Sequence, residues 1–225
     1  MKKLISLLII GIVLTGCVST DSESVLNSLK DTISKEESKT YNIRVNNITN
    51  YVDYYMPSDL AEEDYDDTTF TFSYNEATIV YNINIADIIN NKYYADYLLS
   101  GNSFFNEDYL LLKYNGVLVT AEGDKNYVLE IYQIEDNYLI SFYDVDSQIY
   151  AYSMPGDARE TLRNVYILAK TAETDHDKII ADYSDKDVIS STKKTIDLFS
   201  YVYPSSGYLS DLVKDSSSTG NSTAE

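Results

Sequence analysis

The sequence has few of the residues that most often carry chemistry. It contains one cysteine, one histidine and no tryptophan among 225 residues. A single cysteine excludes an intramolecular disulfide, and a single histidine leaves too few ligands for the usual structural zinc sites. Any Cys-His or Ser-His-Asp arrangement would therefore have to be built on His176.

Basic residues are also scarce, because 36 Asp and Glu face 17 Lys and Arg, giving a net charge of −19. Nucleic-acid affinity depends on Lys and Arg displacing counterions from the phosphates, so we expect no nucleic-acid partner. The eight glycines are scattered and form no phosphate-binding loop, and we expect neither a cofactor nor a bound metal. A hydrophobic fraction of 44% is adequate for the core of one domain.

The N-terminus has the pattern of a secretory signal peptide. Lys2 and Lys3 precede an apolar run from Leu4 to Leu14. As a helix this run spans about 16 Å, roughly half of the ~30 Å hydrocarbon core of a bilayer. It therefore predicts an export signal and not a transmembrane span.

The end of this run resembles the lipobox of bacterial lipoproteins. Leu14-Thr15-Gly16-Cys17 has leucine at −3, a small residue at −2, glycine at −1 and the cysteine. The resemblance covers residues 1–17 and implies attachment of diacylglycerol to Cys17, cleavage before it, and often acylation of the new amino terminus, as with palmitate. Stable anchoring needs two or more acyl chains. We expect the mature protein at the extracytoplasmic face of the cell membrane.

The sequence predicts one α+β domain. Its parts are a signal peptide at 1–16, a lipid anchor and short tether at 17–24, a single domain at 25–213 and a disordered tail at 214–225. Within the domain we expect an N-terminal amphipathic helix, an antiparallel β-meander of about five to seven strands, and C-terminal helices.

Helical spacing of apolar residues continues along 25–56, for example at Val45, Ile48 and Val52. It predicts one long helix or two, ended by Pro57. Residues 59–67 hold six acids and no base, and they predict a solvated loop. After Pro155-Gly156, Asp157 is the predicted N-cap of another helix. Further helices are predicted near 88–97, 187–202 and 209–213.

Alternating apolar residues predict strands at 68–74, 77–85, 110–114, 117–121, 127–134, 138–144 and 148–154. Two-residue turns are predicted at Asn75-Glu76, Asn115-Gly116, Asp136-Asn137 and Asp146-Ser147. In the resulting register, one sheet face collects a core set of Leu129, Ile131, Ile140, Phe142, Ile149 and Ala151.

The opposite face gathers four tyrosines, namely Tyr132, Tyr143, Tyr150 and Tyr152. Tyrosine combines a large contact area with a polar tip and is enriched at recognition surfaces. Codon bias towards A and T accounts for the total of 23 tyrosines, so their placement matters more than their number. We expect this face to be at least partly exposed and to bind a partner, unless the chain's own helix covers it.

Two sequence patterns could carry chemistry, but neither is specific. His176 lies between Asp175 and Asp177, yet no nearby Ser or Gly pattern is typical of a nucleophile, so we expect a solvated surface histidine. Asp144, Asp146 and Gln148 alternate as calcium ligands can. However, the glycine and glutamate positions of an EF-hand hold other residues, so we expect a hairpin turn. No catalytic residue is assigned.

Together these patterns predict a lipid-anchored, non-catalytic binding module whose partner is a protein or another envelope component. Two alternatives remain open. A carboxylate-dependent hydrolase of envelope glycans would need a cleft holding two carboxylates with opposed pKa values. A carrier of lipid or another apolar ligand would need a large apolar pocket.

Overall fold

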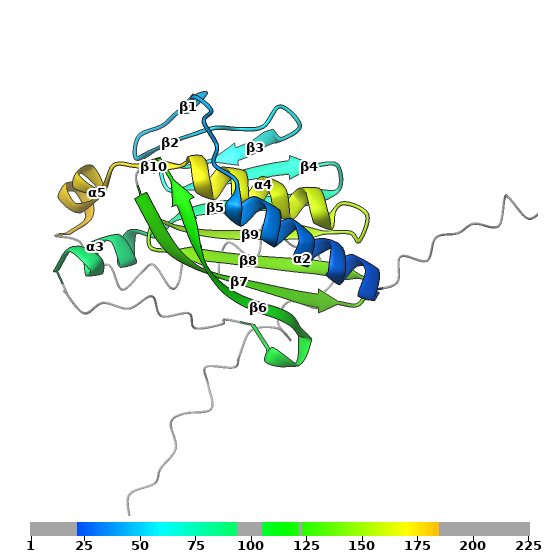
Figure 1. Cartoon of the computed structure of the whole chain (residues 1–225). Coiled ribbons are helices and arrows are strands. Elements are labelled where there is room, and N and C mark those ends of the chain that lie inside the picture. Colours follow the sequence, from blue (N-terminus) through cyan, green and yellow to red (C-terminus); the bar gives the residue numbers. More distant parts are fainter. Residues whose placement is uncertain (1–21, 94–104, 122, 185–225) are drawn as a thin grey trace, which may run out of the picture.

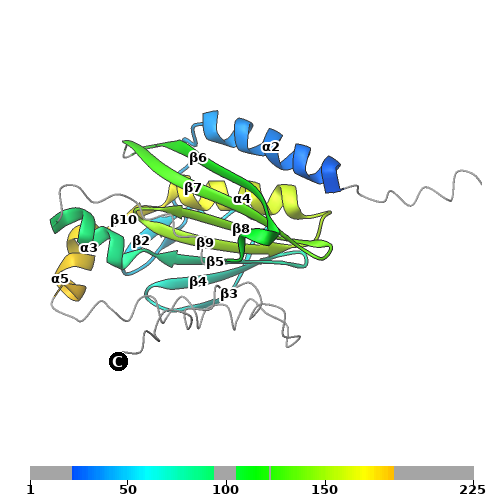
Figure 2. The same ribbon diagram turned by 90° about the horizontal axis from the view of Figure 1, so that it is seen from below.

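The computed structural model describes residues 22–93, 105–121 and 123–184, and they form an α+β fold. A seven-stranded antiparallel sheet has the order β3-β4-β5-β9-β8-β7-β6, and a three-stranded sheet has the order β1-β2-β10. Figures 1 and 2 show the large sheet with helices on one face. The predicted fold class is confirmed.

The large sheet consists of two meanders that meet where β5 pairs with β9. Its strands are β3 (Ala61–Tyr65), β4 (Thr69–Tyr74), β5 (Ala77–Ile83), β6 (Leu110–Thr120), β7 (Gly123–Ile134), β8 (Asn137–Asp144) and β9 (Ser147–Ser153). The other elements are α2 (Ser22–Ser38), β1 (Asn47–Ile48), β2 (Val52–Tyr54), α3 (Ile85–Tyr93), η1 (Glu107–Tyr109), α4 (Ala158–Thr171), β10 (Glu173–Thr174) and α5 (His176–Tyr183).

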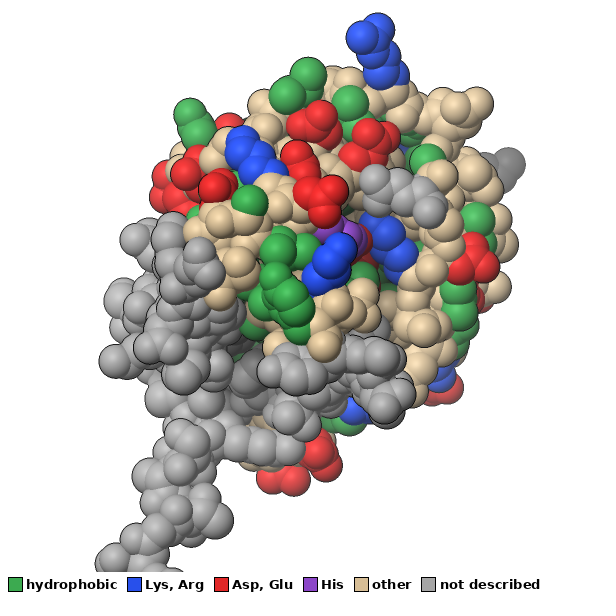
Figure 3. Space-filling view, turned by 90° about the vertical axis from the view of Figure 1, so that its left-hand side faces the viewer, with side chains coloured by type: hydrophobic (Ala, Val, Ile, Leu, Met, Phe, Trp, Pro, Cys, Tyr) green, Lys and Arg blue, Asp and Glu red, His purple; other side chains and the backbone are tan. Residues whose placement is uncertain are grey.

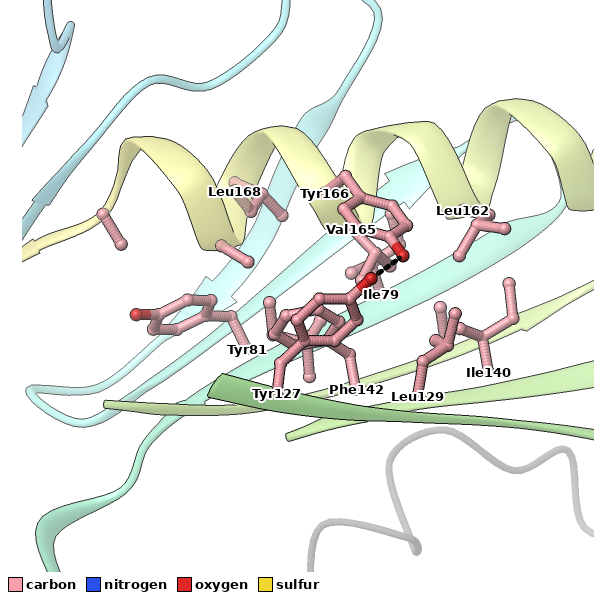
Figure 4. Close-up of a cluster of buried hydrophobic side chains, with 14 of the residues drawn as sticks. Ile79, Tyr81, Tyr127, Leu129, Ile140, Phe142, Leu162, Val165, Tyr166 and Leu168 are labelled. Atoms are coloured by element: carbon pink, nitrogen blue, oxygen red, sulfur yellow. Dashed lines mark hydrogen bonds between the residues drawn. The ribbon is translucent and has the colours of Figure 1, made fainter. Parts of the chain in front are cut away.

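The core lies between the sheet and the two long helices. Helices α2 and α4 pack side by side across one sheet face (Figure 1). The six residues predicted for the core face are all buried there. Tyr127 stacks on Phe142 at 4.9 Å between ring centroids, and its hydroxyl lies 2.7 Å from the Tyr166 hydroxyl of α4 (Figure 4). The packing surface is therefore dense and aromatic.

The C-terminal end of α2 is fixed to both α4 and β6. Lys170 Nζ donates to the backbone oxygens of Glu37 at 2.9 Å and Lys39 at 2.6 Å. Carbonyls at a helix C-terminus lack partners within the helix, so the buried lysine satisfies two acceptors at this end. The Glu37 carboxylate accepts hydrogen bonds from the Tyr114 hydroxyl at 2.6 Å and from Val117 N at 3.2 Å.

The predicted turn at Asn115-Gly116 is wrong, because β6 runs unbroken from Leu110 to Thr120. A Cβ at Gly116 would lie 2.4 Å from Glu37 Oε1 and 2.6 Å from the Tyr127 ring. The glycine therefore marks a close approach of side chains to the strand and not a reversal of the chain.

The helical pattern predicted beyond Ser38 is also wrong. Helix α2 ends at that residue, and residues 47–48 and 52–54 are short strands. Valine, isoleucine and tyrosine favour strands, and in β2 the buried Val52 and Tyr54 alternate with Asp53. The apolar spacing suited a helix, but residue type and tertiary pairing decide the outcome.

Residues 59–67 do not form the predicted open loop. Ala61–Tyr65 is strand β3, which pairs with β4 and leaves every side chain exposed. Because β3 is an edge of the sheet, its acids discourage pairing with another chain. The backbone is ordered by the sheet while the charges remain solvated.

The predicted turns would pair Ile131 with Phe142 and Phe142 with Ala151, and the observed register of the β7-β8-β9 meander differs from this by two residues. Ile131 pairs with Ile140, and Phe142 pairs with Ile149. The turns are at Glu135-Asp136 and Val145-Asp146, and Glu135 adopts a positive φ of 54°. A two-residue shift preserves the alternation of side chains, so each residue stays on its predicted face.

The remaining boundaries are mixed. The helix after Asp157 and the Asn75-Glu76 turn are confirmed. Helix α2 begins at Ser22, inside the predicted tether. The signal peptide, the predicted helices at 187–202 and 209–213 and the tail at 214–225 lie outside the described residues. No helix in the described part of the chain is long and apolar enough to cross a membrane.

Replacing Gly116 with alanine should destabilise the fold by about 1–3 kcal/mol, because the added methyl group must displace Glu37 or the Tyr127 ring. Urea denaturation measures this loss. Gly156→Ala is the matched control, since its Cβ would meet nothing within 4 Å. Equal stability of the two variants would contradict the close approach at Gly116.

Candidate functional site

An open recess of about 600 Å³ lies at one end of the large sheet, where β7, β10 and α5 begin. Figure 3 views this end of the molecule and shows the histidine among acidic and basic side chains. The recess is lined by Gly123, Asp124, Lys125, Thr174, Asp175, His176 and Asp177.

A buried carboxylate supports the two basic groups of the recess. The side chain of Asp146 is 3% exposed. Its Oδ1 lies 2.6 Å from His176 Nε2, and its Oδ2 lies 2.5 Å from Lys125 Nζ. Burial acts to raise the pKa of Asp146, but the hydrogen bonds and charges of His176 and Lys125 bring it below its ordinary value. Asp146 is thus ionised and fixes both partners.

A second buried acid shapes the turn that carries Asp146. Asp144 Oδ1 accepts hydrogen bonds from the backbone N–H groups of Asp146 at 2.9 Å and Ser147 at 2.6 Å, and from the Ser147 hydroxyl at 3.0 Å. Burial and the charge of Asp146 raise the pKa of Asp144 to about 7, although Lys125 and Ser147 oppose this. Asp144 therefore holds the turn rather than facing the recess.

The start of α5 forms another part of the recess lining. Asp175 Oδ1 accepts a hydrogen bond from Lys178 N at 3.0 Å and caps this helix. Ile179 of the same helix is fully buried, and β10 just before it pairs with β2. His176 is consequently carried by a segment anchored on both sides.

His176 is a surface residue, as predicted, but it also has a partner that the sequence did not indicate. Its side chain is 45% exposed, but it is oriented by Asp146, which is 30 residues away in the sequence. Local sequence could not show this pair, because it joins the β8-β9 turn to α5. The turn itself was predictable from the two aspartates that also resemble calcium ligands.

The predicted tyrosine face is only partly exposed. Tyr132 and Tyr150 are buried, and their rings lie 5.1 Å and 6.0 Å from that of Phe105. Tyr143 and Tyr152 keep intermediate exposure. The face is therefore partly exposed, as expected, but only through the last two of these tyrosines.

Among the residues that the structure describes, no group of three His, Cys, Asp or Glu side chains could hold a metal ion. The lipobox predicted at residues 14–17 lies outside them. No known protein family matches the chain, and no curated protein matches it either.

The two buried acids with raised pKa values predict that stability falls as the pH rises. Burial raises the pKa of Asp87 to about 6, opposed by a hydrogen bond from Asn84, and the pKa of Asp144 is about 7. Each group binds its proton more tightly in the folded state, so the free energy of unfolding is greatest near pH 4 and decreases towards pH 7. For Asp144 the shift from 3.8 corresponds to on the order of 4 kcal/mol.

Urea denaturation between about pH 4.5 and pH 7.5 measures how the free energy of unfolding changes over most of this range. The pKa of Asp146 is shifted in the opposite direction, so its ionised form stabilises the folded state. This stabilisation is lost only below the ordinary pKa of an aspartate, which lies below the range measured. Asp144→Asn retains the acceptor oxygen and should flatten the profile. A wild-type protein that gains stability over this range would contradict the prediction.

Proposed function

We propose that this protein is an extracytoplasmic binding protein that is anchored to the membrane by lipid on Cys17. It binds its ligand in the recess around His176. The observation that carries the proposal is the buried Asp146, which aims His176 and Lys125 at an open recess. The recess volume of about 600 Å³ is within the ordinary range for small-molecule sites.

The position of α2 favours a recess directed away from the membrane. This helix begins at Ser22, a few residues after Cys17, and its far end contacts Lys170 near the point where α4 leads into β10. A helix of 17 residues is about 25 Å long. Figure 1 shows the start of α2 and helix α5 at opposite ends of the molecule.

The negative charge of the chain means that the lipid must hold the protein at the membrane. A net charge of −19 repels the anionic headgroups of a bacterial membrane. Attraction to the surface would not retain the protein, so attachment depends on the acyl chains. The same charge disfavours polyanionic wall polymers as ligands.

The hydrolase alternative gains one observation but lacks the geometry. Asp144 and Asp146 have pKa values shifted in opposite directions, as a pair of catalytic carboxylates would. However, both are buried, and their oxygens face Ser147, His176 and Lys125. These contacts hold the residues that line the recess, and the two carboxylates are buried behind those residues.

The apolar-carrier alternative is disfavoured by the packing beneath the helices. A carrier would enclose its ligand between helices and sheet. That space holds the side chains of Tyr127, Phe142, Leu162 and Tyr166, as Figure 4 shows. The polar recess at the sheet end is the better candidate for binding.

Cys17→Ser should abolish incorporation of a clickable fatty acid, because the thiol is the only side chain able to form the thioether. Metabolic labelling in a bacterial host, followed by gel fluorescence, measures incorporation. Thr15→Ala is the matched control, since it keeps a small residue in the lipobox and should keep the label. Unchanged labelling of Cys17→Ser would overturn the anchoring proposal.

A further inference from the structure

We propose that residues 144–147, at the junction of β8 and β9, form a pH-sensitive latch of the recess. The latch opens more often as the pH rises from acidic to neutral, because opening lets Asp144 release a proton to water. This inference rests on the proposed function, since the latch regulates the same recess. Its test needs no ligand, so the two can fail separately.

The two buried acids of the latch differ in their partners. Asp144 and Asp146 are 1% and 2% exposed. Asp146 pairs with Lys125 and His176. Asp144 instead accepts hydrogen bonds from the neutral backbone N–H groups of Asp146 and Ser147 and from the Ser147 hydroxyl. A buried charge is costly without a counter-charge, so the closed latch accommodates one ionised carboxylate better than two.

The charges around Asp144 on the described elements do not compensate a second negative charge. Lys125 of β7 attracts such a charge, but burial and the charge of Asp146 outweigh it and raise the pKa of Asp144 to about 7. The other titratable neighbours are Tyr81 of β5 and Tyr127 of β7, whose raised pKa values keep them neutral, His176 of α5, which reaches the latch through Asp146, and Asp87 of α3, which reaches it through Asn84.

The closed latch is a defined hydrogen-bonded arrangement and not a loose turn. Asn84, just before α3, donates from its backbone N to the Asp146 oxygen at 2.8 Å. Its Nδ2 donates to the Asp144 backbone oxygen at 3.1 Å and to Asp87 Oδ2 at 2.5 Å. Opening breaks these contacts and displaces Asp146, which holds Lys125 and His176 in the recess lining. The recess is therefore fully assembled only when the latch is closed.

The proton of Asp144 links this opening to pH. In the closed latch Asp144 has a pKa of about 7, whereas exposure to water restores its ordinary pKa of 3.8. Between these two values each opening releases one proton, so the equilibrium constant for opening rises about tenfold per pH unit. Above about pH 7 it levels off, because Asp144 is ionised in both states. The recess is thus assembled more firmly in acid.

Hydrogen exchange at the amides of Asp146 and Ser147, followed by NMR on the full-length protein in detergent, measures the opening directly. The rate in an unstructured peptide divided by the observed rate gives the protection at each pH. This protection should fall about tenfold per pH unit between about pH 5 and pH 7 and then level off. Both amides should exchange at least about tenfold faster than those at the centre of β8, as a local opening requires.

One variant and one matched control assign the pH dependence to Asp144. Asp144→Asn retains the acceptor oxygen but cannot titrate, so the protection of the two amides should no longer depend on pH. Asp136→Asn removes an exposed carboxylate from the neighbouring β7-β8 turn and should keep the wild-type dependence. Urea denaturation establishes that both variants are folded. In the wild type, the carboxyl carbon of Asp144 should titrate near pH 7.

Three results would overturn the latch. A folded Asp144→Asn variant that keeps the wild-type dependence would assign the titration to His176 or Asp87. Latch amides that exchange no faster than those of β8 would exclude a local opening. An Asp144 carboxyl that titrates at its ordinary pKa would remove the proton on which the latch depends. The proposed function fails separately, if no ligand class raises the melting temperature of the wild type.

Discussion

The buried carboxylate of Asp146 is the contact on which the recess depends. It joins three parts of the chain that are distant in sequence, since it sits in the β8-β9 turn and contacts Lys125 of β7 and His176 of α5. A buried charge is costly unless it is paired, and removal of one partner leaves the other uncompensated. The end of the sheet, the start of α5 and the shape of the recess are therefore coupled.

The neighbouring Asp144 shows what this arrangement costs. Two carboxylates two residues apart are both buried, and the raised pKa of Asp144 reflects burial and the charge of Asp146. A turn with one acid would avoid this repulsion. Retention of an unfavourable buried charge beside an open recess is typical of binding and catalytic sites, where groups are held in place at the expense of stability.

Much of the fold follows from the sequence because strand alternation tolerates error. The predicted register was shifted by two residues, yet Ile131 and Phe142 still face the helices, since parity decides the face. The turn predicted at Asn115-Gly116 was wrong, because a glycine after asparagine is compatible both with a turn and with the close approach of Glu37 that the structure shows. The pairing of Asp146 with His176 was not predictable, because it depends on how α5 returns to the sheet.

Because the chain has one histidine, its ring gives a single set of NMR signals that reports directly on the recess. The central claim is that Asp146 organises this ring for a ligand. Nuclear Overhauser effects from the ring protons should show one fixed ring orientation in the wild type, because Asp146 Oδ1 lies 2.6 Å from His176 Nε2, and Asp146→Asn should lose this orientation. A folded Asp146→Asn variant that keeps the same ring orientation would contradict the account.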